Sequence, residues 1–119
     1  MSNRLEVEEV LELYFRGINE NDCSIIPLAE DVEMSGPMMP ETMHGRAAVR
    51  QQLSDTAPFV ARMVRKRTLI DGDSAAVIIE FEGLNGVTIE GAEIFTVRNG
   101  EIREDHVYFD TRPLIRGSN

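Results

Sequence analysis

The sequence is poor in cysteine and in positive charge, and it contains no tryptophan and no long apolar run. Its single cysteine, Cys23, cannot form an internal disulfide, which predicts a buried or incidental thiol in a cytoplasmic protein. No apolar stretch approaches the roughly 20 residues that a membrane-spanning helix needs. The first residues turn acidic at Glu6 and lack the apolar stretch of a signal peptide, so we expect no membrane interaction.

Positive charge is also scarce: 12 lysines and arginines stand against 21 aspartates and glutamates, which gives a net charge of −9. Such a surface repels a polyanion, so nucleic acid is not expected as a partner. No zinc-type cluster of cysteine and histidine and no glycine-rich phosphate loop is present, so we expect no metal and no cofactor. The 42% hydrophobic content is that of a folded chain, and no repeat or linker divides it. We therefore expect one domain over residues 1–119.

The first segment has the period of an amphipathic helix. Asn3 followed by Glu6 resembles a capping box at its start. Apolar side chains then recur at three- and four-residue spacing and predict a single buried face. That face comprises Val7, Val10, Leu11, Tyr14, Phe15 and Ile18.

Two further helices and a brief strand are expected in the first half. A cap at Asp22 or Ser24 predicts a short second helix that runs through Leu28. Residues 32–35 have the pattern of a brief strand that joins the sheet. A third helix is expected over about residues 46–56, where it stops before a proline.

The second half changes to the two-residue alternation of strands, which predicts an antiparallel meander. The dipeptides Asp71-Gly72, Asn85-Gly86 and Asn99-Gly100 supply the positive φ angles of hairpin turns. Helices segregated from an antiparallel sheet indicate an α+β fold, here a cone-shaped curved sheet wrapped around about three N-terminal helices. The expected strands cover about 59–70, 74–82, 87–98 and 101–110.

Side chains alternate between the two faces of a strand, and this alternation decides which of them face the interior of the cone. On the run 87–98, one face holds Glu93 and Phe95 together with the larger apolar groups, so we expect that face to point inward. Glu93 is then a carboxylate among hydrophobic side chains. The opposite, outward face of the sheet carries Ala76, Ile78, Ala92 and Ile94, which is too apolar to remain exposed and predicts a homodimer through the sheet.

The final run is open to two registers. A two-residue turn at Asn99-Gly100 places His106 on the face of Glu93, whereas a three-residue turn with a glycine bulge places Asp105 and Val107 there. A one-residue slip reverses the whole strand. We favour the bulged register, with Asp105 inward and His106 outward, because it gives the more apolar inward set.

The order of these elements and three local stretches resemble the nuclear transport factor 2-like superfamily, and within it the SnoaL-like and ketosteroid isomerase-like groups. The stretches are LAEDV at 28–32, HGRAAVR at 44–50, and EIFTVRNGEI at 93–102 followed by YFD at 108–110. The resemblance covers nearly the whole chain. It implies a cystatin-like α+β roll with an apolar interior, and it favours the bulged register. The same fold hosts isomerases, cyclases, dehydratases, epoxide hydrolases and non-catalytic binders.

The resemblance also implies roles for polar side chains. Ketosteroid isomerases carry a tyrosine on the first helix that donates a hydrogen bond to the developing enolate oxygen, and Tyr14 matches it. Glu93 falls where those enzymes hold a protonated acid, while Gly36 replaces their aspartate base and Val107 replaces the final-strand aspartate of SnoaL-like cyclases. A carboxyl group in apolar walls has a raised pKa that suits acid/base work. The candidate catalytic residues are therefore Glu93, Asp105 and Tyr14.

The other candidate site residues form the walls and rim of the expected pocket. Most are methionines or aromatic side chains, and methionine adapts to ligands of varied shape. The set is Met34, Met38, Met39, His44, Phe59, Phe81, Ile89, Phe95, Val107 and Phe109. The expected function is a cofactor-free isomerase, cyclase or hydratase/hydrolase acting on an apolar polyketide-, steroid- or terpenoid-like molecule. The alternative is a non-catalytic ligand-binding or dimerisation module of the same fold.

Overall fold

The computed structural model describes residues 3–117. The chain forms three α-helices, two short 3₁₀ turns and six strands over this range. The helices are α1 (Arg4–Asn19), α2 (Arg46–Thr56) and α3 (Arg112–Gly117), and the 3₁₀ turns are Cys23–Ile25 and Ala57–Phe59. The strands are β1 (Leu28–Ser35), β2 (Met43–His44), β3 (Val60–Asp71), β4 (Ser74–Gly83), β5 (Thr88–Arg98) and β6 (Glu101–Phe109).

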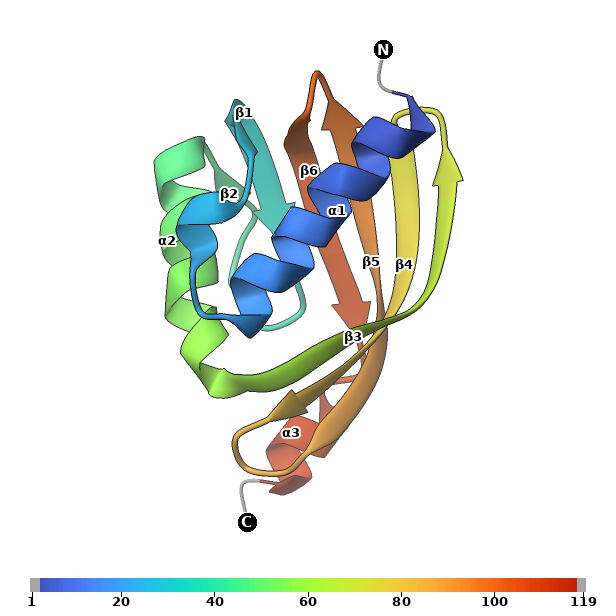
Figure 1. Cartoon of the computed structure of the whole chain (residues 1–119). Coiled ribbons are helices and arrows are strands. Elements are labelled where there is room, and N and C mark those ends of the chain that lie inside the picture. The colour runs from blue at the N-terminus through green and yellow to red at the C-terminus, as the bar shows by residue number, and fades with distance from the viewer. Residues whose placement is uncertain (1–2, 118–119) are drawn as a thin grey trace.

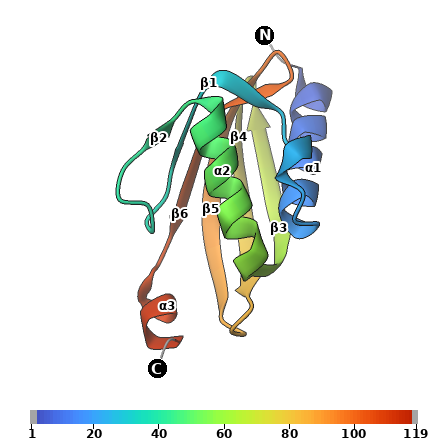
Figure 2. The ribbon, with the colours of Figure 1, turned by 90° about the vertical axis from the view of Figure 1, so that its left-hand side faces the viewer.

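All six strands belong to one curved, unclosed sheet in the order β2-β1-β6-β5-β4-β3. β3 to β6 form the predicted antiparallel meander. β1 runs parallel to β6, so the sheet is mixed rather than wholly antiparallel. α1 crosses the face of the sheet in Figure 1, and α2 lies over the same concave side in Figure 2. This is the α+β cone that the sequence predicts. None of the helices among residues 3–117 is long and apolar enough to cross a membrane.

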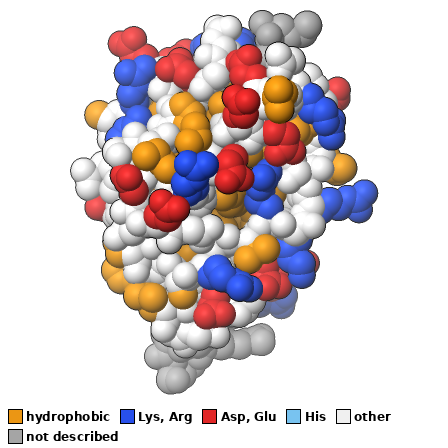
Figure 3. All heavy atoms as spheres, viewed as in Figure 1, with side chains coloured by type: hydrophobic (Ala, Val, Ile, Leu, Met, Phe, Trp, Pro, Cys, Tyr) orange, Lys and Arg blue, Asp and Glu red, His pale blue; other side chains and the backbone are white. Residues whose placement is uncertain are grey.

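α1 provides one wall of the core. The Asn3 side chain accepts a hydrogen bond of 2.8 Å from the backbone N–H of Glu6, as the capping pattern predicts. The predicted apolar face is buried, and acidic and basic side chains are interspersed over the surface seen in Figure 3. Tyr14 and Phe15 both pack edge-to-face against Phe95 of β5, with ring centroids 5.0 and 6.3 Å away. This aromatic cluster ties α1 to the sheet.

The second predicted helix is wrong in extent. Only Cys23–Ile25 forms a 3₁₀ turn, and β1 already begins at Leu28. Pro27 explains the difference, because a proline pushes the preceding residue into an extended conformation. Ile26 accordingly has φ −77° and ψ 121°. β1 is thus longer than the predicted strand, while β2 and α3 have no counterpart in the sequence prediction.

The turn between β5 and β6 has two residues, so the predicted three-residue turn is wrong. Asn99 and Gly100 both have positive φ angles, 56° and 74°. Arg98 pairs with Glu101 directly across this turn. Such a turn matches the right-handed twist of the two strands.

A bulge nevertheless occurs farther along β6, and it restores the inward position predicted for Asp105. After Ile102 the pairing shifts by one residue, so that Arg103 is extra and Thr96 pairs with Glu104. The shift turns Asp105 into the interior, where it is 1% exposed. The predicted orientation of this strand is confirmed, although the bulge lies beyond the turn rather than in it.

Candidate functional site

A cavity of about 580 Å³ opens inside the cone, between the concave face of the sheet, α1 and α2. Its walls are mostly apolar. The polar residues in its lining are Tyr14, Ser35, Gln52, Thr56, Asn85 and Glu93, of which Ser35 points its hydroxyl at His106 on β6. Glu93 is the one acidic residue among the described residues of this lining.

Most of the predicted pocket residues lie in this lining. They are Met34, Met38, Met39, Phe59, Phe81, Val107 and Phe109. Three others do not line the cavity. Ile89 and Phe95 are 3% and 0% exposed, because they pack into the protein interior, and Phe95 is covered by Tyr14. His44 is exposed on β2, where it pairs with Glu33.

The lining also includes residues that the sequence analysis missed. Gln52 and Thr56 come from α2, Leu84 and Asn85 from the β4–β5 turn, and Leu114 from α3. The sequence did carry a signal for the two α2 residues. Residues three and four positions apart share one side of a helix, and Gln52 and Thr56 border the buried face of α2. The turn and α3 carry no periodic pattern that points to the cavity.

Glu93 is a carboxyl group in the cavity wall with no exposed area. The Tyr14 hydroxyl donates a hydrogen bond of 2.6 Å to Glu93 Oε2. Glu93 Oε1 has no hydrogen-bond partner among the described residues. The strand alternation of β5 points Glu93 inward, and the buried stripe of α1 points Tyr14 at it. The carboxyl group is thus held at one oxygen and unpartnered at the other.

Asp105 lies beside this pair but outside the cavity lining. It pairs with Phe95 on β5, and Glu93 pairs with Val107, so the two carboxyl groups are diagonal neighbours on adjacent strands. Neither Asp105 oxygen makes a hydrogen bond of ordinary geometry among residues 3–117. The structure therefore places Asp105 where it acts on Glu93 and not directly on a ligand.

Burial and a neighbouring charge favour the neutral form of Glu93. Loss of hydration raises the pKa of Glu93 well above its ordinary value of 4.5, and the Asp105 carboxylate raises it further, while the hydrogen bond from Tyr14 opposes both. Burial also raises the pKa of Asp105, but the nearby Glu93 and Tyr14 groups lower it. Both carboxyl groups are thus shifted toward the neutral form, and the stronger upward shift of the pKa is on Glu93.

Tyr14 remains a hydrogen-bond donor under the same conditions. Burial and the two carboxyl groups raise the pKa of its phenol well above 10.0. A phenol and two carboxyl groups, all with raised pKa values, thus stand in one buried row, of which Tyr14 and Glu93 belong to the cavity lining.

The sequence matches the SnoaL-like domain over residues 11–105. The chain therefore belongs to the SnoaL-like family, and its structure has the nuclear transport factor 2-like fold of that group. None of the curated proteins matches it.

Similar solved structures share the fold at low sequence identity. An NTF2-like protein of unknown function from Cytophaga hutchinsonii is 22% identical, with 97% of this chain and 99% of that chain covered and a TM-score of 0.76. TerC, crystallised with polyporic acid, is 21% identical over 93% and 96%, with a TM-score of 0.77. An LEH-like epoxide hydrolase from M. tuberculosis is 17% identical over 95% and 89%, with a TM-score of 0.78. Likeness at this identity establishes the architecture and no particular reaction.

Proposed function

We propose that the protein is a cofactor-free acid/base enzyme for a small, largely apolar molecule that carries a reactive oxygen. The observation that carries this proposal is the buried Glu93 in the wall of an apolar cavity, with the Tyr14 hydroxyl hydrogen-bonded to it at 2.6 Å and burial raising the pKa of its carboxyl group. The reaction class is isomerisation, cyclisation, dehydration or hydration. Substrates of polyketide, steroid or terpenoid type fit the apolar lining.

The size of the cavity supports a small-molecule site. Its volume of about 580 Å³ lies within the roughly 300–1,000 Å³ typical of small-molecule pockets. The names of two structural neighbours, one crystallised with polyporic acid and one an epoxide hydrolase, are consistent with small-molecule chemistry in this fold.

In this proposal Glu93 is the general acid. The neutral carboxyl group donates its proton to the substrate oxygen, and the carboxylate that results keeps the hydrogen bond from Tyr14. In an isomerisation or dehydration, a proton released from a substrate carbon then restores the acid, so that no external reagent is consumed. Asp105 is a positioning residue, because its charge keeps the proton on Glu93 before substrate binds.

The proposal can be tested with a panel of apolar probes. β,γ-Unsaturated ketones, epoxides and tertiary allylic alcohols represent isomerisation, hydration and dehydration, and NMR follows their conversion. Wild-type protein without added cofactor is expected to convert at least one class, and Tyr14→Phe to convert it more slowly. Saturable binding of all three classes without conversion of any would contradict the enzyme proposal.

A non-catalytic binding module is the second candidate. Glu93 is the one carboxyl group among the described cavity residues, and Gly36 stands at the position of the aspartate base of ketosteroid isomerases. The lack of a second carboxyl group there favours binding without catalysis. Binding without conversion in the same panel is the result that this candidate predicts.

We also propose a homodimer through the outer face of the sheet. Ile78 and Ile94 are 36% and 37% exposed there, and Tyr108 beside them is 58% exposed. Ala92 pairs with both Ile78 and Tyr108 on the neighbouring strands, so the apolar patch is continuous. Burial of this patch against a second copy removes apolar surface from water.

Light scattering at micromolar concentration is expected to show a wild-type dimer. Ile94→Asp is expected to shift the protein to monomer, because the dimer would bury an unpaired charge. Leu5→Asp is the matched control, since Leu5 is 69% exposed on α1 and away from the sheet face. A monomeric wild type would refute the dimer.

A cytoplasmic location is the remaining expectation. Cys23 is free and buried in the structure, so no disulfide ties this thiol. Cell fractionation of the native protein is the measurement that checks it.

A further inference from the structure

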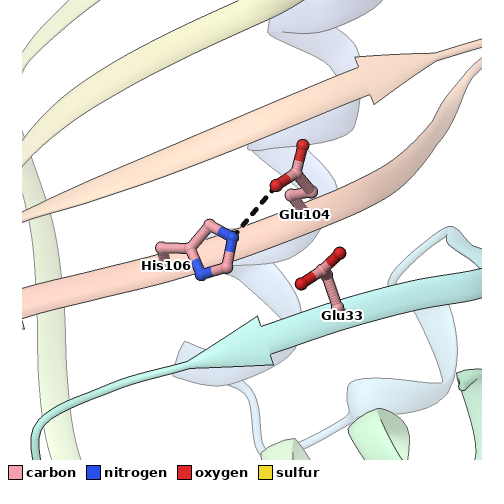
Figure 4. A group of neighbouring side chains, drawn as sticks. All are labelled: Glu33, Glu104 and His106. Atoms are coloured by element: carbon pink, nitrogen blue, oxygen red, sulfur yellow. Dashed lines mark hydrogen bonds and ion pairs between the residues drawn. The ribbon is translucent and has the colours of Figure 1, made fainter. Parts of the chain in front are cut away.

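A second group of polar side chains lies on the face of the sheet opposite the cavity. Figure 4 shows Glu33 extending from β1 and Glu104 and His106 extending from β6 toward a common region. One oxygen or nitrogen of each lies within 4.8 Å of the others. These residues alternate with Met34 and Asp105, which are buried, so the group occupies the outer face. We propose that it binds one divalent transition-metal ion.

The electrostatics of the group call for a cation. Glu33 and Glu104 pair directly across the parallel strands, and like charges in that position destabilise a sheet. Among residues 3–117, Glu104 has an ion pair only with His106, and Glu33 has none. The nearby Arg103 is already paired with Asp31 at 2.6 Å. A divalent ion between the two glutamates would neutralise both charges.

The position of the His106 ring fits a shared ion. Its Nε2 lies 3.1 Å from Glu104 Oε1. Metal–nitrogen and metal–oxygen bonds of about 2.0–2.2 Å place neighbouring ligand atoms roughly 3.0–3.5 Å apart, so these two atoms already have the separation of two ligands on one metal.

Ser35 provides the outer-shell contact that a metal-binding histidine requires. Its Oγ lies 2.5 Å from His106 Nδ1. In the metal-bound form Nδ1–H would donate to Ser35 Oγ, which leaves the lone pair of Nε2 for the ion and fixes the ring. Ser35 and His106 also pair in the β1–β6 ladder, so the backbone holds this contact in place.

The donor set selects the type of ion. Two carboxylates and one imidazole suit zinc or another first-row transition ion, whereas calcium and magnesium prefer oxygen ligands throughout. Three protein ligands leave further positions for water. Because Asp105 points the other way, the ion would not touch the cavity. It would tie β1 to β6 from outside, which is a structural role independent of the proposed acid/base function.

This inference differs from the expectation from the sequence that no metal is bound. That expectation considered ligands close together along the chain. Here the contacting residues are 71 positions apart, as in the pair Ser35 and His106, and only the parallel pairing of β1 with β6 joins them.

Isothermal titration calorimetry of the full chain with Zn²⁺, after treatment with a chelator and its removal, tests the site. We expect one ion per chain, and His106→Gln should weaken binding at least tenfold because it removes a ligand. His44→Gln is the matched control, since His44 is exposed on β2 opposite Glu33 but outside the group. It should bind zinc as the wild type does.

A second variant keeps the test independent of folding defects in His106→Gln. Ser35→Ala retains all three ligands and removes only the outer-shell contact, and it should weaken binding by about 10–100-fold. The proposal is overturned by absence of zinc binding or by a stoichiometry other than one ion per chain. It is equally overturned if His106→Gln and Ser35→Ala bind as the wild type does, or if His44→Gln weakens binding as much as His106→Gln.

Discussion

Replacement of Glu93 with glutamine is expected to lower the turnover of any probe that the wild type converts by about 10²–10⁴-fold. Glutamine has nearly the same shape and can accept the hydrogen bond from Tyr14, but its amide has no acidic proton to transfer to the substrate. Binding of the probe should therefore survive, and the loss should lie in the chemical step. Steady-state kinetics together with a direct binding titration separate the two effects.

Glu90→Gln is the control for this substitution. Glu90 lies on the same strand but points outward and is exposed, so the same replacement of glutamate by glutamine leaves the cavity untouched. Its turnover should equal that of the wild type. If Glu93→Gln retains full activity, carboxyl catalysis by Glu93 is wrong.

The second large effect concerns stability as a function of pH. A carboxyl group with a raised pKa in the folded state keeps its proton at pH values where the same group in the unfolded chain has lost it. Above the unfolded pKa, the folded chain therefore binds more protons than the unfolded chain. The stability that the group contributes is complete below the unfolded pKa, 4.5 for Glu93, and is lost as the pH rises toward the raised folded pKa. One retained proton corresponds to about 1.4 kcal/mol of unfolding free energy per pH unit.

Urea denaturation between pH 5 and pH 7 measures this effect. The free energy of unfolding of the wild type should fall relative to that of Glu93→Gln as the pH rises over these two units. In the variant, the glutamine amide can donate to Asp105, which otherwise lacks a hydrogen bond among the described residues. Parallel pH profiles of the two proteins would contradict a retained proton. Glu90→Gln should follow the wild type.

Much of the architecture was accessible from sequence because it depends on local periodicity. The apolar stripe of α1, the range of α2 and the Asn-Gly and Asp-Gly turns of the meander each follow from the residues within one segment. The inward position of Glu93 followed in the same way, since the alternation along β5 is unbroken. These features need no knowledge of distant parts of the chain.

The parts that were missed depend on pairing between distant segments. The bulge at Arg103 reverses the alternation of β6, and nothing in the local composition marks its position. The parallel pairing of β1 with β6 brings Glu33 beside Glu104, which no spacing in the sequence reveals. Asp105 was correctly turned inward, yet its distance from the cavity depends on how Phe95 and Tyr14 fill the space around it.

The protonation state of Glu93 can be observed directly by ¹³C NMR of side-chain carboxyl carbons in protein labelled at glutamate. The Glu93 resonance is identified as the one that disappears in Glu93→Gln. It is expected to keep the chemical shift of a neutral carboxylic acid at pH 7. A Glu93 resonance with the chemical shift of an ionised carboxylate at pH 7 would contradict the account at its centre, because the cavity would then hold an ordinary carboxylate and no acid.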